Sequence, residues 1–224
     1  MLKSINNNIE AQFLGLIEFD QALNLQNELV QICATKNTQF ILGLEHPQVM
    51  TLGLRAHHTP LNELCSMPWT DPVIKISRGG LATIHNPGQL VIYPIINLRE
   101  NGLPVRGFVQ NLFSTTQKTL KEFNIESTMD LCDQPGLYTA KGKIAFCGLQ
   151  IRNGITMHGI SINIHNDITV FSSFQSCGIA KSHIDSLAQH GVTISTRDFF
   201  QKWLNHFNLS TEMPKACTAE LNLI

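Results

Sequence analysis

The sequence predicts a single domain that combines α-helices with β-strands. Its 224 residues, 43% of them hydrophobic, can close one sizeable core but leave little material for a second domain. Apolar residues recur at helical spacing in three segments, and short apolar runs of strand length lie between those segments. We find no internal repeat and no low-complexity linker. We therefore expect one domain over residues 1–224.

Three helices follow from the apolar spacing. The first covers about residues 21–35 behind Asp20, which is a good N-cap residue. The second follows Pro104, because proline fits the first turn of a helix. The third covers about residues 197–207 and would be capped by Thr196. All three apolar stripes are expected to face the core.

Seven strand-like runs fill the segments between the helices: residues 12–18, 39–44, 73–77, 81–85, 88–96, 143–152 and 155–165. Between the last two runs stands Asn153-Gly154, a pair that favours the left-handed backbone of a two-residue hairpin turn. Counting outward from this turn places Gly148 opposite Gly159. We expect a patch without side chains there, where a ligand could approach the backbone.

The same hairpin register places Lys143 in apolar surroundings. Strand alternation puts it on one face with Ala145, Cys147, Ile160, Ile162 and Ile164. A desolvated amine holds its proton less tightly, so Lys143 could act as a base near neutral pH and then as an acid. The alternative is a lysine at a strand end whose stem covers the core while its head reaches water.

Six cysteines are scattered along the chain without a C-x-x-C pair, so we expect reduced thiols and no zinc knuckle. Cys177 lies in a loop of small residues with a glycine directly after it. A thiolate there could form a thioester, which stays reactive enough to acylate an amine. The alternative is that Cys177 is an inert small hydrophobe, as most cysteines are.

The segment from Ser77 to Gln89 combines a strand, a double-glycine turn and a second strand. Thr83 and His85 share a face of the second strand, so both could line one pocket with Arg78 at its mouth. The segment matches neither a Walker loop nor a dinucleotide fingerprint. It could also be a plain hairpin, with His85 hydrogen-bonded in the core. No histidine pair has the spacing of a zinc protease, and no metal site is expected.

Charge and hydropathy exclude several functions. With 16 basic and 17 acidic residues, the chain has no net attraction to nucleic acid or to an anionic membrane. It lacks an apolar run of membrane-spanning length and the apolar centre of a signal peptide, so a cytoplasmic protein is expected. Basic residues outnumber acidic ones five to one in residues 72–118 and five to two in residues 134–197. Such windows would suit docking of an acidic protein.

Three sequence blocks resemble the lipoyl(octanoyl) transferase family. The first is R-G-G-x-x-T-x-H-x-P-G-Q, which runs from Arg78 to Gln89. The second joins P-G-L-Y at residues 135–138 to G-K-I-A at residues 142–145. The third contains T-M-H-G at residues 156–159, then Asn163 and C-G-I at residues 177–179. The blocks occur in order over about residues 40–190, and we expect residues 208–224 to form a C-terminal tail.

The resemblance implies both a fold and a set of site residues. The family fold is a single α+β catalytic domain, a mixed β-sheet flanked by helices, shared with biotin protein ligases and lipoate ligases. Cys177 would be the acyl-thioester nucleophile, and Lys143 would lower its pKa and move protons. The substrate pocket would be lined by Arg78, Gly79, Gly80, Leu81, Ala82, Thr83, Ile84 and His85, and by Phe146, Cys147, Gly148, Gly159, Ile160 and Ser161.

The resemblance also implies octanoyl transfer in lipoate biosynthesis. Octanoyl-acyl carrier protein would be the donor. Lysine amines on the lipoyl domains of 2-oxoacid dehydrogenases and on the glycine cleavage H protein would be the acceptors. No cofactor and no metal are expected, because a thioester already stores the activation that amide formation needs. No nucleic-acid or membrane partner is expected.

Three other functions remain open. An ATP-dependent lipoate or biotin ligase would activate a free acid and would not need a cysteine placed like Cys177. An octanoyl amidotransferase between lipoyl domains would differ mainly in its donor. A non-catalytic acyl-protein binding module is the third, because two residues depart from the family pattern: Asn86 replaces a common Gly, and Ser176 replaces a common Pro. Asn tolerates positive φ, so the turn at Asn86 could survive.

Overall fold

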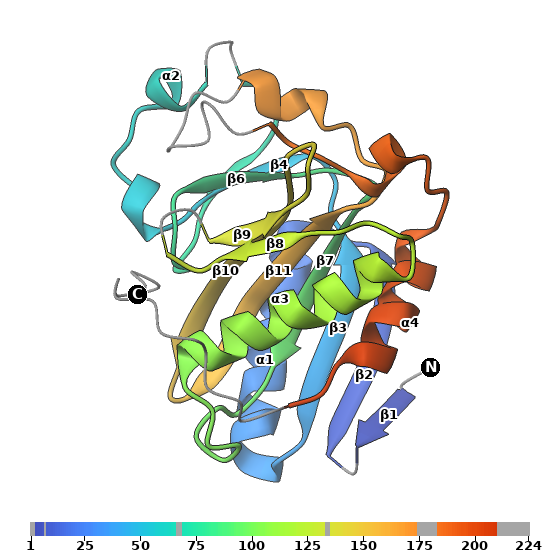
Figure 1. Cartoon of the computed structure of the whole chain (residues 1–224). Coiled ribbons are helices and arrows are strands. Elements are labelled where there is room, and N and C mark those ends of the chain that lie inside the picture. The colour runs from blue at the N-terminus through green and yellow to red at the C-terminus, as the bar shows by residue number, and fades with distance from the viewer. Residues whose placement is uncertain (1–2, 7, 66–68, 133–134, 174–182, 210–224) are drawn as a thin grey trace.

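The computed structural model describes residues 3–6, 8–65, 69–132, 135–173 and 183–209. They form an eight-stranded sheet, a smaller three-stranded sheet and helices on both faces of the large sheet (Figure 1). Helix α1 lies behind the large sheet in Figure 1, while α3 and α4 cross its front. The expected α+β class, with a mixed sheet flanked by helices, is confirmed.

The large sheet has the strand order β1-β2-β3-β7-β11-β10-β9-β8. Strands β2 and β3 run parallel, and the other neighbouring pairs are antiparallel. In that order the bounds are Lys3–Asn6, Ile9–Leu16, Gln39–Glu45, Gln89–Ile95, Ile155–Asn163, Lys143–Arg152, Gly136–Tyr138 and Thr128–Asp130.

The smaller sheet corrects one prediction. It consists of β5 (Val73–Lys75), β4 (Val49–Leu52) and β6 (Ala82–His85), in that order. The predicted hairpin between residues 73–77 and 81–85 is wrong, because β4 lies between β5 and β6 and pairs with both. Strand β4 was not expected, since four buried residues in a row show no alternation of apolar and polar side chains.

The three predicted helices are confirmed as α1 (Phe19–Lys36), α3 (Val105–Lys121) and α4 (Thr196–His206). Two predicted caps are wrong. Asp20 lies inside the first turn of α1. Ser195 caps α4 by accepting a hydrogen bond from the Asp198 backbone N–H at 3.0 Å. The shorter helical segments are α2 (Leu61–Leu64), η1 (Leu54–Ala56), η2 (Thr169–Ser173) and η3 (Leu187–His190).

Each face of the large sheet buries its own core. On the front face, Phe108 and Phe113 of α3 and Phe199 and Trp203 of α4 are fully buried against the sheet. On the rear face, α1 buries apolar side chains against β3 and β7. Large apolar contact areas of this kind provide most of the stability of a domain. The large sheet, which carries β10 and β9, is thereby packed on both faces.

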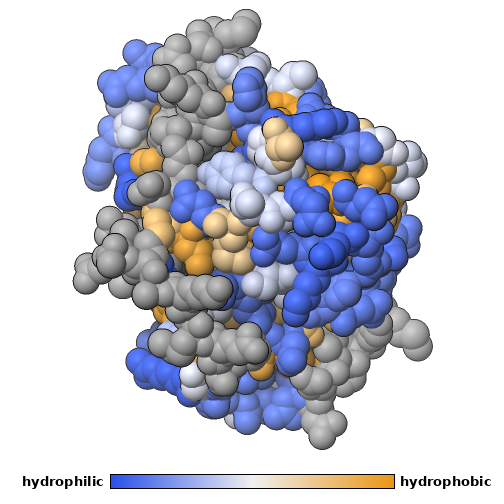
Figure 2. Space-filling view, in the orientation of Figure 1, coloured by the Kyte–Doolittle hydropathy of each residue, from blue (hydrophilic) through white to orange (hydrophobic). Residues whose placement is uncertain are grey.

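The surface seen in Figure 2 is mostly hydrophilic, with hydrophobic patches separated by polar residues. Large hydrophobic side chains that are exposed in the described residues are Leu16, Leu54, Leu61 and Ile151. Isolated residues of this kind are normal on a globular surface. No helix among the described residues is both long enough and apolar enough to cross a membrane.

The hairpin register predicted from Asn153-Gly154 is confirmed. Both turn residues have positive φ, 53° and 85°, as a two-residue turn of this type requires. Strands β10 and β11 pair from Arg152 opposite Ile155 through Gly148 opposite Gly159. This hairpin fixes where Lys143, at the start of β10, lies in the sheet.

Candidate active site

Lys143 carries a buried amine. The residue is 5% exposed, and Nζ lies 5.3 Å from the centre of the Tyr138 ring and 5.0 Å from that of Phe146. Burial lowers the pKa of Lys143 to about 8, although the nearby Asp130 and Cys147 oppose that shift. The prediction of a desolvated amine is therefore confirmed, and a lysine head in water is excluded. Such an amine can exchange a proton near neutral pH.

The alternation expected for Lys143 is interrupted at the start of β10. The pairing of β9 with β10 shifts register between Lys143 and Ala145. A shift of this kind re-aims side chains at the end of a strand. The amine accordingly lies over the Tyr138 and Phe146 rings, while Ile160, Ile162 and Ile164 belong to the core beneath α3 and α4.

The backbone of Lys143 is bonded to the chain that follows the proposed nucleophile segment. Its N–H donates to the carbonyl of His183 at 2.8 Å, and its carbonyl accepts from the N–H of Asp185 at 3.0 Å. Lys143 and Ile184 therefore form a parallel bridge. Gly142 permits this approach, because a Cβ there would lie 2.2 Å from the His183 carbonyl oxygen.

The chain before that segment is also attached near Lys143. Phe171 in η2 stacks on Phe146, with ring centroids 5.8 Å apart and an interplanar angle of 4°. Phe146 is the same residue whose ring faces the Lys143 amine. Cys177 and Ser176 themselves lie outside the described residues. The described residues on both sides of the Cys177 segment thus lie near Lys143. Phe171, before the segment, packs on Phe146, and His183, after it, bonds to the Lys143 backbone.

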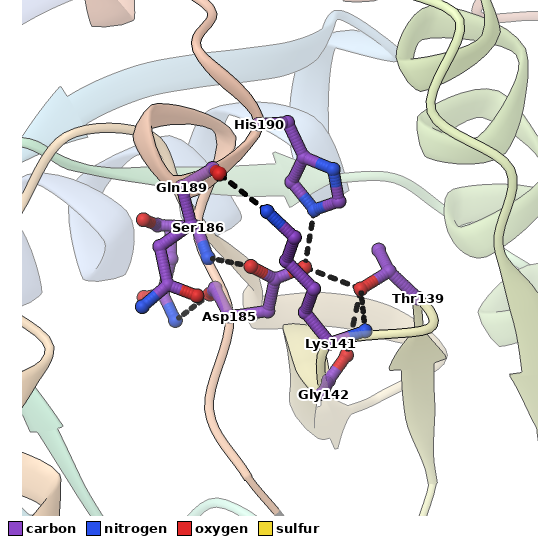
Figure 3. A network of polar contacts seen from close by, with 8 residues as sticks. Thr139, Lys141, Gly142, Asp185, Ser186, Gln189 and His190 are labelled. Atoms are coloured by element: carbon purple, nitrogen blue, oxygen red, sulfur yellow. Dashed lines mark hydrogen bonds and ion pairs between the residues drawn. The ribbon is translucent and has the colours of Figure 1, made fainter.

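A buried carboxylate holds the returning chain in place (Figure 3). Asp185, whose side chain is fully buried, accepts from the Ser186 N–H at 2.8 Å and lies 2.6 Å from Nε2 of His190. Thr139 also donates its hydroxyl to this carboxylate. Thr139 belongs to the turn that leads into Lys143, so Asp185 joins this turn to η3. The sequence did not reveal Asp185, since its partners lie both near and far along the chain.

Arg78 is buried inside the protein. It is 7% exposed, and its guanidinium donates to the Thr51 carbonyl at 2.9 Å and to the Thr51 hydroxyl at 3.0 Å. It also donates to the Gly79 carbonyl at 2.9 Å. A Cβ on Gly148 would lie 3.0 Å from Cδ of Arg78, so the patch at Gly148 is covered by this side chain.

Gly159, which lies opposite Gly148, allows a different close contact. A Cβ on Gly159 would lie 2.1 Å from the carbonyl oxygen of Ile92, because β7 packs closely there. Its neighbours Ile160 and Ser161 are buried in β11.

Cys147 is half-buried, and burial raises the pKa of its thiol to about 12, with Lys143 acting in the opposite direction. A raised pKa disfavours the thiolate, so Cys147 is a useful internal comparison for Cys177.

The double-glycine run forms a connection into β6. The Gly79 N–H donates to the Leu149 carbonyl at 3.0 Å, which ties the run to β10, and Gly80 has φ of 88°. Ala82 and Ile84 are buried in the core of the smaller sheet, whereas Leu81 and Thr83 are half-buried. The structure therefore brings Arg78 and Gly79 to β10.

His85 belongs to a cluster of buried histidines that the sequence did not predict. His46 lies edge-on to His85 at 5.6 Å between ring centroids, and Tyr93 packs against both His46 and His158. Burial lowers the pKa of His46 to about 4 and those of His85 and His158 to about 3. These histidines are neutral at physiological pH. Only tertiary packing brings them together.

The departure at Asn86 is accommodated differently from the prediction. Asn86 is not among the residues with positive φ, and Gly88, with φ of 87°, provides the left-handed step of this turn. The Asn86 side chain donates to the Asp167 carbonyl at 2.8 Å and accepts from Asn166 at 3.0 Å. The residue therefore ties the turn before β7 to the chain after β11.

The remaining groups that could bind a metal or form disulfides are the clustered polar side chains and the cysteines. Among the described residues, no group of three or more His, Cys, Asp or Glu side chains could hold a metal ion. Cys33, Cys65 and Cys147 carry free thiols. Cys132 is disulfide-bonded, so the expectation of reduced thiols throughout is wrong at that residue.

Comparisons with known proteins show what this chain is similar to. The sequence pattern of the family described as "Lipoyl protein ligase A/B catalytic domain" matches residues 18–208. An octanoyltransferase from Anaplasma marginale is 36% identical over 191 residues, which cover 83% of this chain and 87% of that protein. An octanoyltransferase from Chromobacterium violaceum is 31% identical over 205 residues, covering 91% and 97%.

Solved structures show the same fold. A bi-partite lipoate protein ligase from Thermoplasma acidophilum, studied with its E2 lipoyl domain, has a TM-score of 0.66 at 12% identity, covering 89% of this chain and 81% of that one. Lipoate-protein ligase A bound with ATP has a TM-score of 0.65 at 9% identity, covering 89% and 83%. A biotin protein ligase from Aquifex aeolicus has a TM-score of 0.51 at 14% identity, covering 90% and 69%. The expected lipoate and biotin ligase fold is confirmed.

Proposed function

This chain belongs to the lipoyl protein ligase A/B catalytic-domain family, and on that premise we propose that it is an octanoyltransferase. It moves an octanoyl group from octanoyl-acyl carrier protein to a lysine amine of a lipoyl domain. Cys177 carries the octanoyl group between the two half-reactions as a thioester. Octanoyltransferase relatives at 31–36% identity support this acyl-transfer chemistry.

The observation that carries the proposal is the buried Lys143 amine between the two anchored ends of the Cys177 segment. Its pKa of about 8 lets it take a proton from a thiol and return it at neutral pH. Cys177 stands four residues after Ser173 and six before His183. An extended chain covers up to about 3.5 Å per residue, so Cys177 is separated by at most roughly 21 Å of chain from His183, whose carbonyl accepts from the Lys143 backbone.

In the first half-reaction, neutral Lys143 takes the proton from the Cys177 thiol. The thiolate attacks the octanoyl carbonyl, and the carbon–sulfur bond to the carrier breaks. The departing carrier sulfur takes the proton from the Lys143 ammonium. The octanoyl group is then on Cys177, and Lys143 is again neutral.

In the second half-reaction, the neutral lysine amine of a lipoyl domain attacks the Cys177 thioester. The new carbon–nitrogen bond forms, and the carbon–sulfur bond to Cys177 breaks. Lys143 takes a proton from the attacking nitrogen and delivers it to the Cys177 sulfur. The product is an octanoyl amide, and no nucleotide is consumed.

The test is to incubate the protein with octanoyl-acyl carrier protein, without ATP, and to look for an octanoyl adduct by intact mass. A phosphine reductant should be present, because Cys132 is disulfide-bonded and a thiol reductant would intercept thioesters. Peptide mapping should place the adduct on Cys177. Cys177→Ala should abolish it, whereas Cys147→Ala tests whether another cysteine of the site carries it.

The acceptor step is tested by adding a lipoyl domain to the isolated octanoyl-enzyme. We expect the octanoyl group to move to the lipoyl-domain lysine. Adduct formation only from free octanoate and ATP would overturn the proposal in favour of a ligase. Adduct formation from an octanoylated lipoyl domain but not from the acyl carrier would favour the amidotransferase. Binding of either partner without transfer would indicate a non-catalytic module.

A further inference from the structure

The amine of Lys143 lies over two aromatic rings that come from neighbouring strands. Its Nζ lies 5.0 Å from the centre of the Phe146 ring, on β10, and 5.3 Å from that of the Tyr138 ring, on β9. Both distances are within the roughly 6 Å over which the face of an aromatic ring attracts a cation. Two rings therefore act on one buried amine.

An irregularity in the strand brings Phe146 to the same side as Lys143. Regular alternation would place these two side chains on opposite faces, because they are three residues apart. The pairing of β9 with β10 shifts register between Lys143 and Ala145, so the alternation is interrupted there. Tyr138 stands opposite Lys143 in this pairing, and Gly136 stands opposite Phe146 and leaves room for the lysine stem. The fold thus gathers both rings around the amine.

The Phe146 ring is itself held by Phe171. The two rings are nearly parallel, with an interplanar angle of 4° and centroids 5.8 Å apart. Phe171, in η2, is buried in the core of the smaller sheet. Stacking restricts the plane of a ring, and a ring with a fixed plane presents a defined face. The core of the smaller sheet therefore helps to set how Phe146 meets the amine.

The titratable groups that face the amine among the described residues are Asp130, Cys147 and Tyr138. The charge of Asp130, on β8, favours the ammonium. Burial raises the pKa of the Cys147 thiol to about 12, and burial together with Asp130 raises that of the Tyr138 phenol to about 12. Both groups are uncharged at neutral pH. Tyr138 therefore offers the amine a neutral ring.

An aromatic face binds an ammonium differently from a carboxylate. The ring attracts the positive charge through its quadrupole, but it does not take the proton. A carboxylate in direct contact would favour the charged amine much more strongly and raise its pKa. A group that must accept a proton and then return it is better served by the weaker attraction of the rings.

We propose that Tyr138 and Phe146 form an aromatic clamp that binds the protonated form of Lys143, with Phe171 holding the Phe146 ring in place. The clamp does not involve Cys177. Its role in catalysis rests on the proposed octanoyl transfer, in which Lys143 becomes protonated in both half-reactions. The rings stabilise that ammonium where burial has removed water from it. All three aromatic residues are positioning residues, because they act through Lys143.

The clamp is tested by titrating Lys143 in protein labelled with ¹³C at lysine Cε. ¹H–¹³C spectra should show one lysine that titrates near pH 8, and Lys143→Met assigns it by removing its signal. Phenylalanine analogues with one to three ring fluorines at residue 146 weaken the negative ring face but nearly keep its shape. The pKa of Lys143 should fall with each fluorine, by about 0.5–1.5 over the series. A pKa that is the same with every ring would overturn the inference.

Matched substitutions separate the two rings from general effects. Tyr138→Phe keeps the ring and should leave the pKa of Lys143 within about 0.3 of its wild-type value. A larger fall would show that the hydroxyl, and not the ring, holds the ammonium. The same fluorinated analogues at Phe123 are the control, because that ring lies 5.6 Å from the amine of Lys202 and should not affect Lys143.

The part played by Phe171 is tested with Phe171→Leu. Loss of the stacking partner should make the pKa of Lys143 depend less on the fluorines at residue 146, because the ring no longer presents a fixed face. An unchanged dependence would overturn the role of Phe171.

The consequence for the reaction is tested by the pH dependence of octanoyl transfer. Neutral Lys143 takes a proton in each half-reaction, so the rate should rise with pH as Lys143 loses its own proton. The midpoint of that rise should move to lower pH along the fluorine series, by the same amount as the pKa measured by NMR. A midpoint that stays in place while the pKa moves would overturn the link between the clamp and transfer.

The clamp and the proposed function can be judged separately. Failure of the wild-type protein to form an octanoyl-enzyme would overturn the proposed function. The titration of Lys143 does not depend on that reaction, so it would still support or overturn the clamp.

Discussion

The side chain of Lys143 lies directly against Gly136, so closely that a Cβ on Gly136 would come within 2.3 Å of Cε of Lys143. The same Cβ would also lie 2.9 Å from the Ala145 carbonyl oxygen and 3.0 Å from the lysine amine. Distances this short force atoms to move. The glycine at residue 136 therefore determines where the amine of Lys143 can be.

Gly136→Ala should accordingly displace the Lys143 amine from the Tyr138 and Phe146 rings. We expect the octanoyl-transfer rate to fall at least tenfold and the free energy of unfolding to fall by about 1–3 kcal/mol, as for other overpacked sites. Stopped assays and urea unfolding measure the two effects. Gly102→Ala is the control, because nothing lies within 4 Å of a Cβ there and only its φ of 62° opposes alanine. Full activity of Gly136→Ala would contradict the tight packing of Lys143.

Lys143→Met should make the protein more stable at pH 7 while stopping transfer. The folded pKa of about 8 is below the ordinary 10.5, so burying the ammonium costs folding free energy. That cost is fully present below pH 8 and disappears as the pH rises toward 10.5. We expect a gain of about 1–3 kcal/mol at pH 7 that shrinks at pH 10. Urea unfolding at both pH values measures it, and a less stable variant at pH 7 would show that the amine is not desolvated.

Asp185→Asn should destabilise the protein more than any comparable change on the surface. Its fully buried carboxylate accepts from Ser186, Thr139 and His190, and an amide cannot satisfy all three donors. We expect a loss of about 3–5 kcal/mol. Glu122→Gln is the matched control, since Glu122 pairs with Lys202 and His206 in solvent and should cost less than about 1 kcal/mol. Similar losses for the two variants would exclude a special role for Asp185.

The buried histidines should make the protein sensitive to mild acid. The pKa values of His46, His85 and His158 are lowered to about 3–4, below the ordinary 6.5 of the unfolded chain. As the pH falls below 6.5, only the unfolded state gains these protons, so stability falls. Each histidine contributes a loss of about 1.4 kcal/mol per pH unit until its folded pKa is reached. Urea unfolding between pH 7.5 and 4.5 measures the slope, and a flat profile would contradict neutral burial.

Local sequence signals predicted much of the fold that positions Lys143. Asn153-Gly154 needs no distant partner to favour its turn, and the register from Arg152 to Gly148 follows from counting outward from that turn. The apolar stripes of α1, α3 and α4 were likewise visible, because a helix repeats its buried face within a few residues.

Tertiary contacts determined what the sequence could not reveal. Strand β4 enters between β5 and β6 from an earlier part of the chain, which turned an expected hairpin into a three-stranded sheet. Arg78 is drawn inside by Thr51, and Asp185 by Thr139 and His190. These partners have no fixed spacing along the chain. The position of Cys177 beside Lys143 remains a prediction.

The most direct test of the central claim is the pH dependence of Cys177 alkylation by iodoacetamide, followed by peptide mapping in the presence of a phosphine reductant. If the Lys143 amine stabilises the Cys177 thiolate, Cys177 should react with an apparent pKa below about 8.5, the ordinary value for a thiol. In Lys143→Met that pKa should rise, and the rate at pH 7 should fall about tenfold or more. Identical profiles in the two proteins would show that Lys143 does not act on Cys177.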